Sequence, residues 1–117
     1  MSYKSERAKI DFILEMIENI ERIEDRHGGV VSALEDFEGK MAILMGLAQI
    51  GETLKKLDDT FIEKAELARE KEGAYFTRNY IVHDYEGIDL YIVEDILVNH
   101  LPVLKHKLAA FQSGADN

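Results

Sequence analysis

Apolar residues recur every three or four positions along most of this 117-residue chain, and residues that interrupt helices are scarce. This period places the apolar side chains on one face of a helix. The aromatic and β-branched stretch 74–83 has some strand character, but a lone strand would leave its backbone hydrogen bonds unsatisfied. That stretch is therefore predicted to be a short helix. We predict an all-α fold, a bundle of about five helices.

The first predicted helix covers about residues 5–26 and ends at the sequence "HGG". Its apolar residues form two neighbouring stripes, which together are wider than the usual core-facing stripe of a surface helix. Such a helix is buried either in the middle of a bundle or on two sides, against the core and a second subunit. The first stripe contains Ile10, Ile13, Leu14, Ile17 and Ile20, and the second contains Phe12, Met16 and Ile23.

Two later stretches have the spacing of a capping box, in which a hydroxyl and a carboxylate satisfy free backbone donors at a helix start. Ser32 with Glu35 predicts a helix over about 32–57. A threonine and a glutamate at 60–63 predict a short charged helix, which we expect to end at Gly73.

Glycine and proline positions add three expectations. Gly46 and Gly51 reduce helix propensity within the second predicted helix, so we expect a neighbouring helix to approach closely there. Asp89 is the predicted N-cap of the last helix. Pro102 removes a backbone donor from that helix and predicts a kink.

Composition limits the possible functions. The length predicts one domain, residues 1–117, and the absence of cysteine excludes disulfides and thiolate metal sites. No apolar run reaches the roughly 20 residues that span a bilayer. The N-terminus lacks the apolar segment of a signal peptide, so a cytoplasmic location is expected. The net charge of −9 argues against bulk nucleic-acid binding, and we expect no DNA partner and no membrane contact.

The stretch "RNYIVHDY" contains the most distinctive polar residues, which are Arg78, Asn79, His83 and Tyr85. An arginine fork suits phosphate oxygens, and a histidine can take and give a proton near neutral pH. Together they suffice for RNA cleavage without a metal. Arg78 and His83 lie about 140° apart on an ideal helix, so either His83 lies at the helix end, or the arginine reaches round, or two copies cooperate. Asn79 shares a face with His83 and could orient the imidazole or donate to a phosphate.

The spacing alone also fits an ordinary helix-end arginine, a half-buried histidine and a core tyrosine. A carboxylate-bridged metal site is a further alternative, because Glu24 and His27 have the Glu-x-x-His spacing, but only one copy is present and no metal is expected. Solvated polar residues account better for His27, His100 and His106. Four aromatic residues are expected in the core rather than as stacking platforms for bases: Tyr75, Phe76, Tyr80 and Tyr91.

The motif Arg-x4-His-x-Tyr resembles the signature of the HEPN superfamily in the form found in its HepT-like toxins. The stretch "AQIGETLKKL" at 48–57 resembles the second-helix region of that family, and "HDYEGID" followed by "LPVL" resembles its C-terminal half. These matches cover most of the chain in the expected order.

The resemblance implies a homodimeric toxin of a toxin–antitoxin pair that cleaves RNA without a metal or another cofactor, at a composite site between two facing motifs. It implies that Arg78 and His83 are the catalytic pair, with Asn79 as their polar neighbour. It also implies that a nucleotidyltransferase antitoxin silences the toxin by attaching AMP to Tyr85. A phosphate-bearing group near His83 would add negative charge where an RNA phosphate should bind.

The charge of the motif region fits RNA poorly. Between residues 75 and 100 the only lysine or arginine is Arg78, among five acidic residues. We therefore expect basic residues from elsewhere to assist, either the pair Lys55 and Lys56 or the pair Lys105 and Lys107. The alternative is a non-catalytic helical module that binds a nucleotidyltransferase or a nucleotide.

Overall fold

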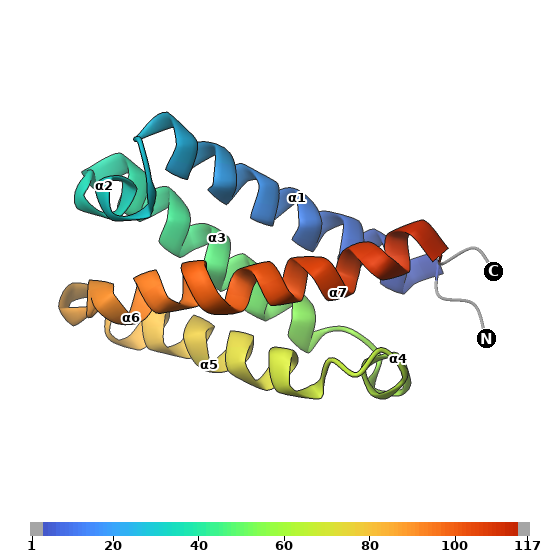
Figure 1. Cartoon of the computed structure of the whole chain (residues 1–117). Coiled ribbons are helices and arrows are strands. Elements are labelled where there is room, and N and C mark those ends of the chain that lie inside the picture. Colours follow the sequence, from blue (N-terminus) through green and yellow to red (C-terminus); the bar gives the residue numbers. More distant parts are fainter. Residues whose placement is uncertain (1–3, 115–117) are drawn as a thin grey trace.

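The computed structural model describes residues 4–114, which form helices and short connections and include no strand. The predicted all-α fold is confirmed. Helices α1, α3, α5 and the continuous α6–η2–α7 segment run along the bundle, while the short α2 and α4 lie at its opposite ends (Figure 1). The elements are α1 (Lys4–Arg26), α2 (Val30–Glu35), α3 (Phe37–Lys55), α4 (Asp59–Lys64), α5 (Ala68–His83), the 3-10 turn η1 (Tyr85–Gly87), α6 (Leu90–Asp95), the π-helical turn η2 (Ile96–His100) and α7 (Leu101–Gly114).

The capping box predicted at Ser32 and Glu35 is wrong. Ser32 lies inside α2, which begins after Gly29, and the chain then turns at Asp36. The backbone of Asp36 is extended, and its carboxylate accepts a hydrogen bond of 2.8 Å from the backbone N–H of Gly39, so Asp36 caps α3. The predicted helix over 32–57 is therefore divided in two, because a carboxylate that can cap a helix lies four residues after the serine.

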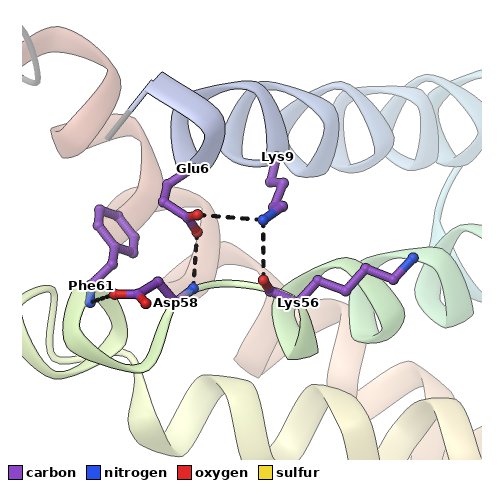
Figure 2. A network of polar contacts seen from close by, with 5 residues as sticks. All are labelled: Glu6, Lys9, Lys56, Asp58 and Phe61. Atoms are coloured by element: carbon purple, nitrogen blue, oxygen red, sulfur yellow. Dashed lines mark hydrogen bonds and ion pairs between the residues drawn. The ribbon is translucent and has the colours of Figure 1, made fainter. Parts of the chain in front are cut away.

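The capping box predicted at 60–63 is also wrong by two residues. Asp58 caps α4 through a 3.2 Å hydrogen bond from the N–H of Phe61, and its own N–H donates to the carboxylate of Glu6 on α1. Lys9 joins this network by donating to Glu6 and to the carbonyl oxygen of Lys56 (Figure 2). The network attaches α1 to the end of α3 and the start of α4, and this attachment sets where α4 begins.

Gly73 does not end a helix. It lies inside α5, which begins at Ala68 and continues to His83, so stretch 74–83 is helical as predicted but belongs to a longer helix. The chain turn before α5 instead includes Glu66, whose φ is 56°.

The core confirms the first apolar stripe of α1, because Ile10, Ile13, Leu14, Ile17 and Ile20 are all buried. The second stripe is not buried to the same degree within the chain. Phe12 is exposed, and Met16 and Ile23 are partly buried against the core. Helix α1 therefore lies at the side of the bundle rather than at its centre. Phe76 and Tyr91 are also exposed, so the expectation that all four aromatic residues of this region lie in the core is wrong for these two.

The predicted close approach at Gly46 and Gly51 is confirmed. A Cβ atom at Gly46 would lie 3.0 Å from the Cδ1 atom of Ile20 on α1. A Cβ atom at Gly51 would overlap the carbonyl oxygen of Ala74 on α5 and lie 2.8 Å from the Cβ atom of Arg78. Glycine at 51 thus allows α5 to pack directly on the backbone of α3.

The last helical segment begins as predicted, because the carboxylate of Asp89 accepts a 2.9 Å hydrogen bond from the N–H of Tyr91. The irregularity expected at Pro102 lies just before it, in the π-helical turn η2. The N–H of Leu101 there bonds to the carbonyl oxygen of Ile96. Pro102 has no N–H to donate to the preceding turn, and this wider turn accommodates the loss.

Candidate functional site

Helix α5 and the turn after it carry all four residues of the motif. Arg78 and Asn79 lie in the last two turns of α5, and His83 is its final residue. Tyr85 begins the 3-10 turn η1. Of the arrangements that the 140° separation allowed, the structure has His83 at the end of the helix.

Arg78 is held by two neighbours at a half-buried position. Its Nε atom forms an ion pair of 2.9 Å with Oε1 of Glu52 on α3, and its Nη1 atom donates a 2.8 Å hydrogen bond to Oδ1 of Asn79. The guanidinium carbon also lies 5.9 Å from the ring centroid of Tyr75. Two anchored nitrogens fix the plane of the guanidinium group and leave its remaining N–H donors for another ligand.

Glu52 is the functional candidate that sequence reasoning missed. It follows Gly51, where the backbone of α3 lies close to Ala74 and Arg78 of α5, and its carboxylate reaches Arg78. The signal in the sequence was the pair "GE", a carboxylate next to a glycine at which a close helix approach was expected.

His83 is exposed, and within residues 4–114 its imidazole forms no hydrogen bond. The side-chain oxygen of Asn79 is directed to Arg78, so Asn79 does not orient the imidazole through that atom. The structure therefore joins Arg78 to Asn79 by a hydrogen bond and, within residues 4–114, shows none from His83 to either residue. Its ring nitrogens are available to another molecule.

A groove of about 420 Å³ lies between α3 and α5, and we call it the α3/α5 groove. Arg78 and Glu52 line one part of it, and Tyr85 lines another. The hydroxyl of Tyr85 contacts the sulfur of Met41 on α3. The full lining consists of Met41, Leu44, Met45, Ala48, Gln49, Glu52, Arg78, Ile81, Val82 and Tyr85.

The lysines expected to assist Arg78 divide into two groups. Lys105 forms an ion pair of 2.8 Å with Glu21 on α1, and this hydrogen bond raises the pKa of Lys105. Lys107 forms an ion pair of 3.1 Å with Glu70. Both therefore connect helices within the bundle. Lys55 is closer to the motif, because its Nζ atom lies 3.9 Å from the ring centroid of Tyr75, the ring that Arg78 also approaches.

The other histidines with side-chain contacts have ordinary partners. The ring of His27 lies between the carbonyl oxygen of Ile23, at 2.8 Å, and Oδ2 of Asp36, at 3.1 Å. The ring of His100 pairs with Asp95 at 3.2 Å. In the described part of the chain no three histidine, aspartate or glutamate side chains are grouped so that they could hold a metal ion.

No helix in residues 4–114 is both long enough and apolar enough to span a membrane.

Comparison with known families decides the wider assignment. The family described as "Ribonuclease HepT-like" matches residues 13–111, a range that contains the whole groove and all four motif residues. The chain belongs to the HepT-like ribonuclease family. The resemblance to the HEPN superfamily is thereby confirmed, and it supports ribonuclease activity for this HepT-like chain.

One curated relative of this HepT-like protein comes from the archaeon Methanocaldococcus jannaschii and carries the name "Putative RNase MJ0127". It is 31% identical over 93 residues, which cover 78% of this chain and 76% of the relative. The search of solved structures gave no significant match.

Proposed function

We propose that this protein is a metal-independent endoribonuclease that acts as a homodimer, with Arg78 as the phosphate ligand and His83 as the general acid and base. The observation that carries the proposal is the fixed guanidinium of Arg78 in the α3/α5 groove, with N–H donors that residues 4–114 do not use. Membership of a ribonuclease family supplies the reaction class.

The chemistry requires only the RNA itself and these side chains. His83 removes the proton from a ribose 2′-hydroxyl, and the 2′-oxygen attacks the adjacent phosphorus. Arg78 stabilises the negative charge that develops on the phosphoryl oxygens. The bond from phosphorus to the 5′-oxygen then breaks as His83 gives its proton to that oxygen, so the products are a 2′,3′-cyclic phosphate and a strand with a 5′-hydroxyl. Asn79 keeps its amide N–H groups for a phosphate oxygen, because its carbonyl oxygen accepts from Arg78.

A homodimer explains both the exposed apolar side chains and the separation of Arg78 from His83. Phe37, Met41 and Met45 recur every four residues along one face of α3 and are exposed, at 71%, 41% and 61%. Val82 on α5 lines the same groove as Met41 and Met45 and is also exposed. Large exposed apolar patches mark interaction surfaces in soluble proteins. In the proposed dimer this face meets its copy, and each active site takes Arg78 from one protomer and His83 from the other.

Tyr85 is the proposed site of regulation. Its side chain is 42% exposed, and it lines the same groove as Arg78. We propose that a nucleotidyltransferase antitoxin attaches AMP to its hydroxyl. The phosphate of the adduct would compete with RNA for Arg78 and would add bulk where the substrate binds. The protein would then be the toxin of a toxin–antitoxin pair.

A non-catalytic module that binds a nucleotidyltransferase or a nucleotide is the second candidate. The charge of the motif region favours it, because Lys105 and Lys107 are paired with carboxylates of other helices and leave Arg78 with few basic neighbours.

The discriminating experiment is cleavage of total RNA by the purified protein in EDTA, beside the variants Arg78→Ala and His83→Ala. Intact mass of the same preparation identifies any AMP adduct on Tyr85, so that a silenced sample is not mistaken for an inactive one. The proposal expects cleavage by the unmodified wild type and at least a hundredfold loss in each variant. Intact RNA with unmodified wild type would leave the binding module as the better account.

A further inference from the structure

We infer that Glu52 is a positioning residue for the ribonuclease site, which holds the Arg78 guanidinium so that its free edge faces the substrate phosphate. This inference rests on the proposed function and assigns a role within that same site. The carboxylate of Glu52 lines the α3/α5 groove together with Arg78.

The geometry begins with the backbone. Gly51 brings α3 so close to α5 that a side chain there would lie 2.8 Å from the Cβ atom of Arg78. The next residue, Glu52, then reaches Nε of Arg78 at 2.9 Å. Asn79 accepts from Nη1 at 2.8 Å. The contact at Nε and the contact at Nη1 lie on different edges of the planar group, so together they prevent its rotation.

The free donors are the ones that a phosphate needs. Arginine has five N–H donors, and Glu52 and Asn79 face two of its three nitrogens. Nη2 forms no hydrogen bond with residues 4–114, and Nη1 retains one of its two N–H groups. Neighbouring N–H donors on the Nη1 and Nη2 nitrogens are the arrangement that binds two oxygens of one phosphate. A carboxylate that blocked the site would occupy the edge between these two nitrogens, whereas Glu52 contacts Nε.

The charge of Glu52 has a second consequence. A carboxylate beside the groove repels RNA and partly neutralises Arg78, so it weakens substrate binding while it fixes the catalytic geometry. Loss of the carboxylate is therefore expected to slow the chemical step and to strengthen substrate binding. We expect kcat to fall, because a misplaced group costs about ten- to a hundredfold in rate, and KM to fall as well. A residue that only stabilised the fold would not change both constants. Partial unfolding lowers the fraction of active protein, so it reduces kcat in proportion to the folded population and leaves KM unchanged.

The test compares Glu52→Gln and Glu52→Ala with the wild type in EDTA on a defined RNA. Glutamine keeps an oxygen that can accept from Nε, so kcat should decrease in the order wild type, Glu52→Gln, Glu52→Ala. Glu15→Gln is the matched control, because Glu15 is exposed on α1 and its substitution changes the net charge equally. Unfolding of each variant by urea gives the folded fraction under the assay conditions. Faster cleavage by Glu52→Ala would show a blocking role and would overturn the inference, as would unchanged kcat.

A second measurement does not depend on cleavage. Hydrogen exchange at the Nε–H of Arg78, followed by NMR, should be slow in the wild type and should approach that of the exposed Arg26 in Glu52→Ala. Equal exchange in both proteins would refute the positioning role even if RNA is cut. The two proposals can also be separated. Suppose that exchange behaves as expected and that a non-cleavable 2′-deoxy RNA analogue binds less tightly to Arg78→Ala than to the wild type. If no RNA is cleaved in that case, the proposed reaction is wrong and the positioning of Arg78 by Glu52 stands.

Discussion

The contact at Gly51 gives the sharpest prediction about how the site is built. In Gly51→Ala the new methyl group would overlap the carbonyl oxygen of Ala74 and would press on the Cβ atom of Arg78. Both of these atoms are fixed to the α5 backbone, so rotation of a side chain cannot relieve the overlap, and α5 must move away from α3. Overpacking of this kind costs about 1–3 kcal/mol. Alanine returns about 1 kcal/mol of helix propensity, so the net loss should be no more than about 2 kcal/mol.

Gly73→Ala is the matched control for this prediction. Gly73 also lies within a helix, α5, but nothing lies within 4 Å of the position its Cβ atom would take. The control should therefore gain up to about 1 kcal/mol from helix propensity alone. Urea unfolding followed by circular dichroism gives both free energies of unfolding. Equal stabilisation by the two substitutions would refute the close packing of α3 on α5. RNA cleavage by Gly51→Ala should fall further than its folded fraction, because the shift separates Glu52 from Arg78.

Three further predictions concern other parts of the molecule. Glu6→Ala should lower the free energy of unfolding by about 1–3 kcal/mol in urea titrations, because it leaves the backbone donor at the start of α4 without its acceptor. The hydrogen bond from the N–H of Gly39 holds the pKa of Asp36 below its ordinary value of 3.8, with a smaller contribution from the neighbouring imidazole. The stabilisation from Asp36 is therefore complete above that value and is lost as the pH falls through the lower folded-state pKa. Urea midpoints measured between about pH 5 and pH 2 should fall more steeply for the wild type than for Asp36→Asn. Met45→Asp should convert the proposed dimer to a monomer in analytical ultracentrifugation, whereas Val103→Asp, at a similarly exposed position on α7, should remain a dimer.

The sequence predicted those features that depend on one helix at a time. The buried stripe of α1, the helical state of stretch 74–83 and the N-cap at Asp89 all follow from local periodicity and capping. The approach at Gly51 was also predictable, because a glycine among apolar residues of a helix indicates a neighbouring backbone.

The errors arose where two local signals competed. Serine at 32 matched a capping box, but the extended backbone at Asp36 made aspartate the actual cap. The sequence predicts a helix end at Gly73, but the φ of this residue is not positive and the helix continues through it. In the first case a carboxylate four residues further along supplied the cap, and in the second the backbone of the glycine stayed helical.

The missing parts of the site are contacts between distant residues. Glu52 and Arg78 are 26 positions apart, since 78 − 52 = 26, and only the packing of α5 on α3 brings them together. The pairing of Lys105 with Glu21 likewise depends on how the C-terminal segment lies against α1. No local pattern predicts such contacts, although each becomes plain once the helices are placed.

The most direct test of the account is to mix two inactive variants. Arg78→Ala and His83→Ala are each expected to leave RNA intact in EDTA. After subunit exchange, verified by native mass spectrometry, half of the dimers contain one of each chain. Each such dimer has one active site with an intact Arg78 and an intact His83. The mixture should therefore recover roughly a quarter of the wild-type activity. A mixture that exchanges subunits but remains inactive would contradict a site shared between protomers, and an unmodified wild type that leaves RNA intact would contradict the ribonuclease itself.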